Sequence, residues 1–252
     1  MSSDPHARHT DARPFQVDLR GVVDLLSRHI YSSPHVFVRE LLQNGRDAVA
    51  ARALVDPAAP PGQLRIEPTR DGAPFRFHDN GVGLTLDEAG ELLSTVGRSS
   101  KRDEVLALRR EEFLGQFGIG MLSCFMVADR IVVRSRSARG GAAIEWVGEA
   151  AGTFALRELT AAEADEVQVG TTVELVPRPD DAALLAPDSV ATLAARYGEY
   201  LPLNVAIADG TGGWDAITRP AAFLERDETA LRDLGREWLG ADPLDVIPID
   251  VP

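Results

Sequence analysis

The stretch from Ser33 to Leu54, SPHVFVRELLQNGRDAVAARAL, decides the fold and carries the first candidate site residues. Ser33 followed by Pro34 is typical of a helix start, because a serine oxygen can cap free amides and proline is tolerated at the first helical position. We therefore predict a helix that begins at Pro34. Its apolar residues recur at helical spacing and share one broad arc, which predicts a face packed on a core.

Three polar residues of this helix, Glu40, Asn44 and Asp47, form a narrow sector at the edge of the apolar arc. Neither carboxylate has a basic residue three or four positions away, and helical spacing places Arg39 and Arg46 on another face. A solvated charged face is the ordinary alternative. Two carboxylates and an amide beside apolar surface instead predict a ligand, and the amide oxygen of Asn44 suits a hydrated magnesium ion with nucleotide phosphates.

A second polar motif, HDNGVGL at His78–Leu84, follows a predicted strand. Gly81 and Gly83 allow close backbone approach or a positive φ, and Asp79 offers an acceptor at the mouth of the turn. Taken alone, this motif is explained as well by a plain Asx turn. Behind a helix that carries Glu-x-x-x-Asn, it predicts one wall of a binding site.

The glycine-rich segment Phe113–Gly120, FLGQFGIG, follows a charged stretch and has the composition of a hinged lid. Its glycines free successive amides to point at an anion, and MLSCFMVAD behind it predicts a helix whose positive end faces phosphates. A structural turn before a buried helix is the alternative.

Composition narrows the function classes. The chain has 252 residues, 44% hydrophobic, which is enough for one globular domain and part of a second. A net charge of −13 argues against a nucleic-acid partner, and the absence of a long apolar run argues against a membrane and for a cytoplasmic location. The one cysteine, Cys124, is interpreted as a small buried side chain, and Lys101 follows a serine, which excludes a phosphate-binding P-loop.

The order of elements predicts the fold class. Helical patterns dominate the early part, and alternating strands follow in RIVVRSRS, AAIEWVG, TFALREL and TTVELVP. We predict an α+β two-layer sandwich, a mainly antiparallel sheet with helices on one face. Residues 1–14 are expected to form a flexible leader, PRPDDAALLAP a loop, NVAIA a strand and ADGTGGW a linker, with a helix near TALRDLGREWL.

In this order, RELLQNGRDAV, DNGVGL, GRSSK, GQFGIGMLSCFMVAD and GTTVEL resemble the N-terminal ATPase domain of the ninety-kilodalton heat-shock chaperones, including the bacterial high-temperature protein G type. These belong to the GHKL superfamily with gyrase, MutL and sensor histidine kinases. The resemblance implies the Bergerat ATP-binding fold over residues 15–207. Residues 208–252 would then be a linker and the start of a truncated middle-domain segment.

The resemblance also implies roles for single residues. Glu40 would be the general base that activates water, with Arg98 near the phosphates, where the family commonly has a lysine; Asn44 would hold Mg²⁺, and Asp79 would accept the adenine amino group. The residues implied to contact ATP or ADP are Asn44, Asp47, Ala48, Asp79, Gly83, Leu84, Arg98, Gln116, Phe117, Gly118, Ile119, Gly120, Met121 and Thr171.

Departures from the family pattern concern the lid and the length. Met121 replaces an aromatic residue and Gly-Arg-Ser-Ser-Lys replaces a more typical Ala-Lys-Ser-Gly-Thr, which affects lid kinetics and base-pocket shape. The expectation is a fragment or truncated relative that hydrolyses ATP weakly and is monomeric. The full-length protein would be a homodimer that acts on unfolded client proteins in folding and the stress response.

Two alternatives remain from the sequence. One is another GHKL ATPase of MutL or gyrase type that acts on DNA, which the acidic charge disfavours. The other is a module that senses nucleotide without hydrolysis, which the presence of Glu40 disfavours.

Overall fold

The computed structural model describes residues 33–93, 120–219, 228–243 and 245. It confirms the predicted α+β class: one 8-stranded sheet has the strand order β5-β4-β3-β6-β2-β1-β7-β8. The strands are β1 Gln63–Glu67, β2 Phe75–Asp79, β3 Ala128–Arg136, β4 Ile144–Glu149, β5 Phe154–Glu158, β6 Gly170–Pro177, β7 Asn204–Ala208 and β8 Trp214–Ala216.

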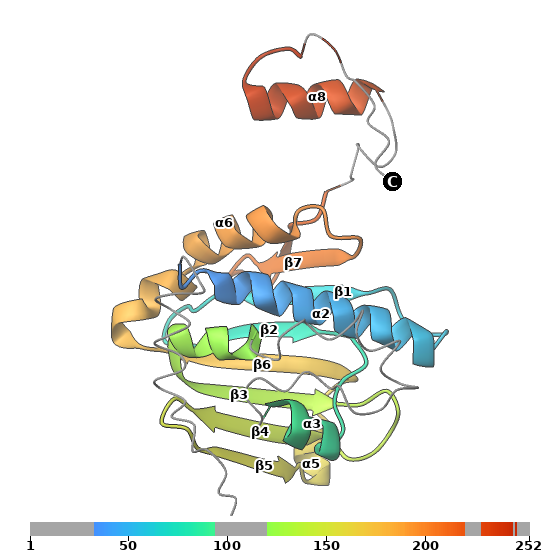
Figure 1. The fold of residues 1–252 in the computed structure, drawn as a ribbon, viewed down its shortest axis with the longest axis vertical. Helices are drawn as coiled ribbons and strands as arrows, with labels where there is room; N and C mark the ends of the chain where they lie inside the picture. Colours follow the sequence, from blue (N-terminus) through green and yellow to red (C-terminus); the bar gives the residue numbers. More distant parts are fainter. Residues whose placement is uncertain (1–32, 94–119, 220–227, 244, 246–252) are drawn as a thin grey trace, which may run out of the picture.

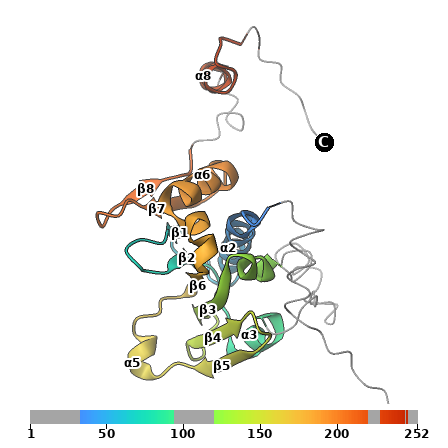
Figure 2. The ribbon, with the colours of Figure 1, turned by 90° about the vertical axis from the view of Figure 1, so that its left-hand side faces the viewer.

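Neighbouring strands are antiparallel except β1 and β7, which are parallel. Figure 2 views the sheet along its edge and shows the helices α2, α3 and α6 on one side of it. The helices are α2 Val36–Val55, α3 Leu86–Leu93, α5 Ala161–Ala164, α6 Pro187–Gly198 and α8 Glu228–Leu239, with 3-10 helices η2 Gly120–Met126 and η3 Pro179–Leu185. Helices and sheet therefore form two layers with the core between them.

Helix α2 lies across the middle of the sheet (Figure 1). It buries Phe37, Val38, Leu41 and Leu42, and the Phe37 ring meets Phe75 of β2 edge to face at 5.5 Å. Alternate residues of the strands supply the other side of this core. The apolar arc predicted for this stretch is thus confirmed.

Three local predictions about helices are wrong. Helix α2 begins at Val36 rather than Pro34: the hydroxyl of Ser33 accepts a hydrogen bond from the amide of His35, which precedes the helix, and caps no helical amide. MLSCFMVAD does not form one helix: η2 ends at Met126 and Ala128 already starts β3. The predicted loop PRPDDAALLAP contains η3.

The stretch ADGTGGW is not a linker. Asp209 closes a turn by accepting the amides of Thr211 and Gly213, and β8 then pairs with β7. The sheet therefore continues beyond Ile207. Helix α8 was predicted correctly, and Trp238 on it meets Tyr200 edge to face. Residues 1–14 lie outside the described residues.

The turn after β2 depends on Gly83. Its φ is +64°, and a Cβ at this position would lie 2.0 Å from the carbonyl oxygen of Arg136. Gly72 has a similar φ of +82° but nothing within 4 Å.

We predict that Gly83→Ala lowers the free energy of unfolding by about 3 kcal/mol or more, since a left-handed backbone costs an alanine about 1–2 kcal/mol and the clash adds to it. Gly72→Ala, which shares the backbone strain and lacks the clash, should lose only about 1 kcal/mol. Urea unfolding of both variants measures the difference. Equal losses would show that the contact with Arg136 relaxes without cost.

Candidate functional site

Three polar side chains form a row across adjacent strands of the sheet. In the sheet register, Asp79 of β2 lies opposite Thr171 of β6, and Thr171 lies opposite Ser135 of β3. Asp79 and Ser135 follow the buried residues Phe77 and Val133 in phase. Thr171 precedes the buried Val173 in the same phase, so all three point into the helix-covered layer. At this row, polar side chains replace the apolar side chains that form the core between the sheet and the helices.

Asp79 is 5% exposed, and its Oδ1 accepts the amide of Gly81 at 2.8 Å. Burial raises the pKa of this carboxyl to about 7, although hydrogen bonds from the backbone of Gly81 and Thr171 oppose the rise. A buried carboxylate with a raised pKa gains most from a ligand that donates hydrogen bonds to it. The predicted Asx turn and the predicted acceptor are therefore both present.

Ser135 was missed by the sequence analysis. It is fully buried, donates to the carbonyl of Gly170 at 2.8 Å, lies 3.0 Å from the hydroxyl of Thr171, and accepts the amide of Leu84 at 2.9 Å. It thereby joins the loop after Asp79 to the strands that carry Thr171. In the sequence it is one serine in an alternating strand, so only the pairing of β3 with β6 reveals it.

Helix α2 forms the second wall. The amide of Val82 donates to the carbonyl of Ala48 at 2.9 Å, which fixes the DNGVGL loop against the helix. A Cβ on Gly81 would lie 2.5 Å from that of Ala48, so this contact requires a glycine. The two sequence motifs that predicted the site thus touch each other.

Glu40 and Asn44 lie one turn apart on α2, beside the start of η2. A Cβ on Gly120 would lie 2.8 Å from Oε2 of Glu40 and 3.6 Å from the amide nitrogen of Asn44. The end of the glycine-rich segment therefore reaches the polar sector of the helix, as predicted. Met121 follows it, packed at the edge of the core.

The expectation that the two carboxylates of α2 lack basic partners is wrong. Arg39 pairs with Oε1 of Glu40 at 2.7 Å and Arg46 pairs with Oδ1 of Asp47 at 2.6 Å. A guanidinium on a long, flexible stem can reach the next residue, which helical spacing alone does not reveal. The Asp47 side chain is nonetheless largely buried, with only 11% of it exposed. Burial raises its pKa, although the nearby Arg46 acts to lower it.

The described residues include side chains that could contact a nucleotide with its magnesium ion, but they form no cluster of protein ligands around a metal. Among the described residues, no group of three or more His, Cys, Asp or Glu is arranged to hold a metal. The half-buried Asn44 amide beside Glu40 fits Mg²⁺ nonetheless, because this ion keeps several waters and takes few protein ligands besides phosphates. The chemistry of the donor set therefore agrees with the prediction.

The other predicted site residues divide by their position. Gly83, Leu84 and Ala48 belong to the contacts described above. Arg98, Gln116, Phe117, Gly118 and Ile119 lie outside the described residues, as does the rest of the predicted lid. Cys124 is buried, as predicted, and burial raises its pKa to about 12, so it is no nucleophile. No described helix is long and apolar enough to cross a membrane.

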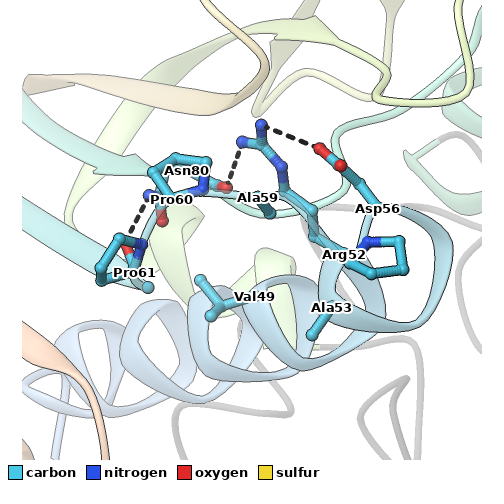
Figure 3. Close-up of a pocket in the computed structure, with 10 residues that line it drawn as sticks. Val49, Arg52, Ala53, Asp56, Ala59, Pro60, Pro61 and Asn80 are labelled. Carbon is cyan, nitrogen blue, oxygen red and sulfur yellow. Dashed lines mark hydrogen bonds and ion pairs between the residues drawn. The ribbon is translucent and has the colours of Figure 1, made fainter.

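Two hollows of about 260 and 530 Å³ lie elsewhere, around Arg52 and Asn80. Neither is lined by Glu40, Asn44 or Asp79. Figure 3 shows the smaller one, where Arg52 reaches from α2 toward Asn80 and Asp56.

Comparison with known proteins gives one family and many relatives. Residues 31–171, more than half of the chain, match the family described as histidine kinase-, DNA gyrase B-, and HSP90-like ATPase. Similar proteins include chaperone protein HtpG from Myxococcus xanthus (27% identical, 90% of this chain, 38% of the relative), from Salinispora tropica (29%, 92%, 41%) and from Yersinia pestis (27%, 88%, 38%). The chain spans about two fifths of the length of these relatives.

Proposed function

Because the chain belongs to the histidine kinase-, DNA gyrase B- and HSP90-like ATPase family, we propose that it is the ATP-binding and ATP-hydrolysing part of a heat-shock-protein-90 type chaperone. Relatives named HtpG match about nine tenths of the chain and confirm the resemblance predicted from the motifs. The observation that carries the proposal is the buried Asp79 opposite Thr171, facing the α2 wall that bears Glu40 and Asn44.

In this proposal, Asp79 accepts the exocyclic amino group of adenine, and its burial makes that acceptance selective. Thr171 and the backbone around Gly83 and Leu84 border the base. In a purine with a carbonyl in place of the amino group, the carbonyl oxygen would face the carboxylate of Asp79. Both groups are hydrogen-bond acceptors, so such a purine would bind poorly. The site therefore selects adenine over guanine.

The phosphates would lie toward Gly120, and the resemblance implies that backbone amides of the glycine-rich segment and Arg98 contact them. Asn44 would hold Mg²⁺, which would neutralise phosphate charge when bound. Glu40 would take a proton from the attacking water through Oε2, because Oε1 is already paired with Arg39. Its side chain is 16% exposed, which leaves water access to the carboxylate.

The full protein would couple nucleotide state to the folding of client proteins, as a homodimer in the cytoplasm. The chain spans about two fifths of the length of its relatives, so these functions are proposed for the whole protein. A DNA-acting ATPase of MutL or gyrase type is not favoured, given the HtpG relatives.

The test is calorimetric titration of the chain with ADP and with a non-hydrolysable ATP analogue, each with and without magnesium. We expect one-to-one binding that magnesium strengthens at least tenfold, since Asn44 would hold the ion and the ion would offset phosphate charge. GDP should bind at least a hundredfold more weakly. Equal affinity for ADP and GDP would refute the role of Asp79 in base selection.

A further inference from the structure

The sheet face that carries no long helices is lined with paired charges. Arg76 pairs with Glu174 at 2.9 Å, and Glu145 is shared by Arg134 at 2.9 Å and Arg157 at 2.8 Å. These arginines each have a carboxylate on a neighbouring strand, as cross-strand stabilisation requires. The face is therefore balanced in charge over β2 to β6.

Arg65 of β1 is the exception on this face. Within residues 33–93, 120–219, 228–243 and 245 its guanidinium makes no hydrogen bond or ion pair, and its Nε is buried without a partner. It lies over the ring of Trp214 at 5.0 Å, and its cross-strand neighbour is His78, another basic residue. Glu67 lies two residues further along the same strand, but it forms its ion pair with Arg76, at 3.6 Å.

Arg65 and His78 line the larger hollow, whose volume is about 530 Å³. Arg52, at the end of α2, lines it as well, and none of its lining residues is acidic. The remaining polar wall consists of amides, including Gln63, Gln168 and Asn204. The hollow is therefore lined by basic residues and by no acidic residue, although the chain as a whole has a net charge of −13.

The Arg52 guanidinium lies between partners on two sides. Its Nη1 donates to the carbonyl of Asn80 at 2.7 Å and its Nη2 lies 3.5 Å from Asp56, as Figure 3 shows. Its Nη1 also donates to the carbonyl of Val169 at 3.5 Å. Its Nε, like that of Arg65, is buried without a partner. Two guanidinium groups from different elements thus retain buried donor capacity beside one hollow.

We propose that this hollow binds a small phosphorylated ligand, with its phosphate between Arg52 and Arg65 and its polar remainder against the amides. Guanidinium groups bind phosphate oxygens in pairs of hydrogen bonds, and the volume is that of a small-molecule site. His78 accepts or donates one bond at 2.9 Å to Thr172 through Nδ1, which leaves Nε2 for the ligand. Arg65 and His78 alternate with the buried residues of β1 and β2 and so face away from the layer that holds Asp79, while Arg52 reaches the hollow from α2. Asp79, Glu40 and Asn44 do not line the hollow, and the proposal does not depend on the proposed ATPase function.

The experiment is an NMR titration of the whole chain with inorganic phosphate and then pyrophosphate, at constant ionic strength set with chloride. The probes are the imidazole of His78 and the indole of Trp214, because both contact Arg65 and neither belongs to the proposed nucleotide site. We expect saturable shifts of both, with pyrophosphate binding at least fivefold more tightly than phosphate because it spans both arginines.

Arg65→Gln should weaken binding at least tenfold. The matched control is Arg130→Gln, which removes the same charge from a β3 residue with a 53% exposed side chain outside the hollow, and it should bind as the parent does. Gln168→Glu adds a negative charge at an exposed position of the rim and should weaken binding severalfold even if Arg65→Gln fails to fold. Shifts that never saturate, or equal affinities of Gln168→Glu and the parent, would overturn the site.

Discussion

We expect Asp79→Asn to abolish detectable adenine-nucleotide binding while the protein stays folded. The parent carboxylate offers several acceptor positions, of which the amide of Gly81 uses one. An asparagine can keep that bond through its single oxygen, but its NH₂ group then meets the adenine amino group, donor against donor. We expect at least a hundredfold loss of affinity for ADP by calorimetry.

The same variant should be more stable than the parent at alkaline pH. The pKa of Asp79 is about 7 in the fold against 3.8 when unfolded, so the folded state keeps a proton that the unfolded state has lost. Stability therefore falls as pH rises from about 4 to 7, by up to about 4 kcal/mol at 1.36 kcal/mol per unit. Asparagine does not titrate, so thermal melting should favour Asp79→Asn at pH 8 and show little gain near pH 4.

Asp215→Asn is the matched control, because it makes the same charge change at an exposed position of β8. It should leave both the affinity and the pH dependence of melting unchanged. An Asp79→Asn protein that binds ADP as the parent does would disprove the adenine contact. A melting difference independent of pH would mean that Asp79 is ionised throughout.

Glu40→Ala should reduce the rate of ATP hydrolysis by about 100-fold or more, within the range that general-base catalysis contributes. ADP affinity should change by less than about threefold, since the proposed function assigns that binding to Asp79 and the backbone. Single-turnover hydrolysis with excess protein measures the chemical step even where turnover is slow. Glu158→Ala, an exposed glutamate on β5, is the control and should keep the parent rate. Equal rates in the parent and Glu40→Ala would remove the catalytic assignment.

The sequence predicted the strand PFRFHD with Asp79 at its end, and the structure gives β2 as Phe75–Asp79. Asp79 lies two residues after the buried Phe77, so the alternation of the strand turns it inward. The glycines at 81 and 83 predicted close approach, and the structure gives the partners as Ala48 and Arg136. The need for glycine at these positions could be inferred from the motif itself, whereas the contact partners could not.

Three features of the structure could not be predicted from local sequence patterns. Ser135 joins the site only because β3 lies beside β6, and nothing in its own segment distinguishes it. The pairing of Arg39 with Glu40 depends on side-chain rotamers rather than helical phase. Strand β8 is three residues long, too short for alternation to be visible against the glycines before it.

The position of β6 between β2 and β3 also has a consequence for synthesis on the ribosome. Phe77 pairs with Val173, so the centre of the sheet cannot close until residues beyond 173 have been made. At about 5–20 residues per second, the nascent chain then carries the apolar face of α2 and the β1–β2 hairpin unsealed for roughly 5–20 s. During that interval the segment that will form the core is itself an exposed hydrophobic polypeptide, the kind of surface that holdase chaperones bind.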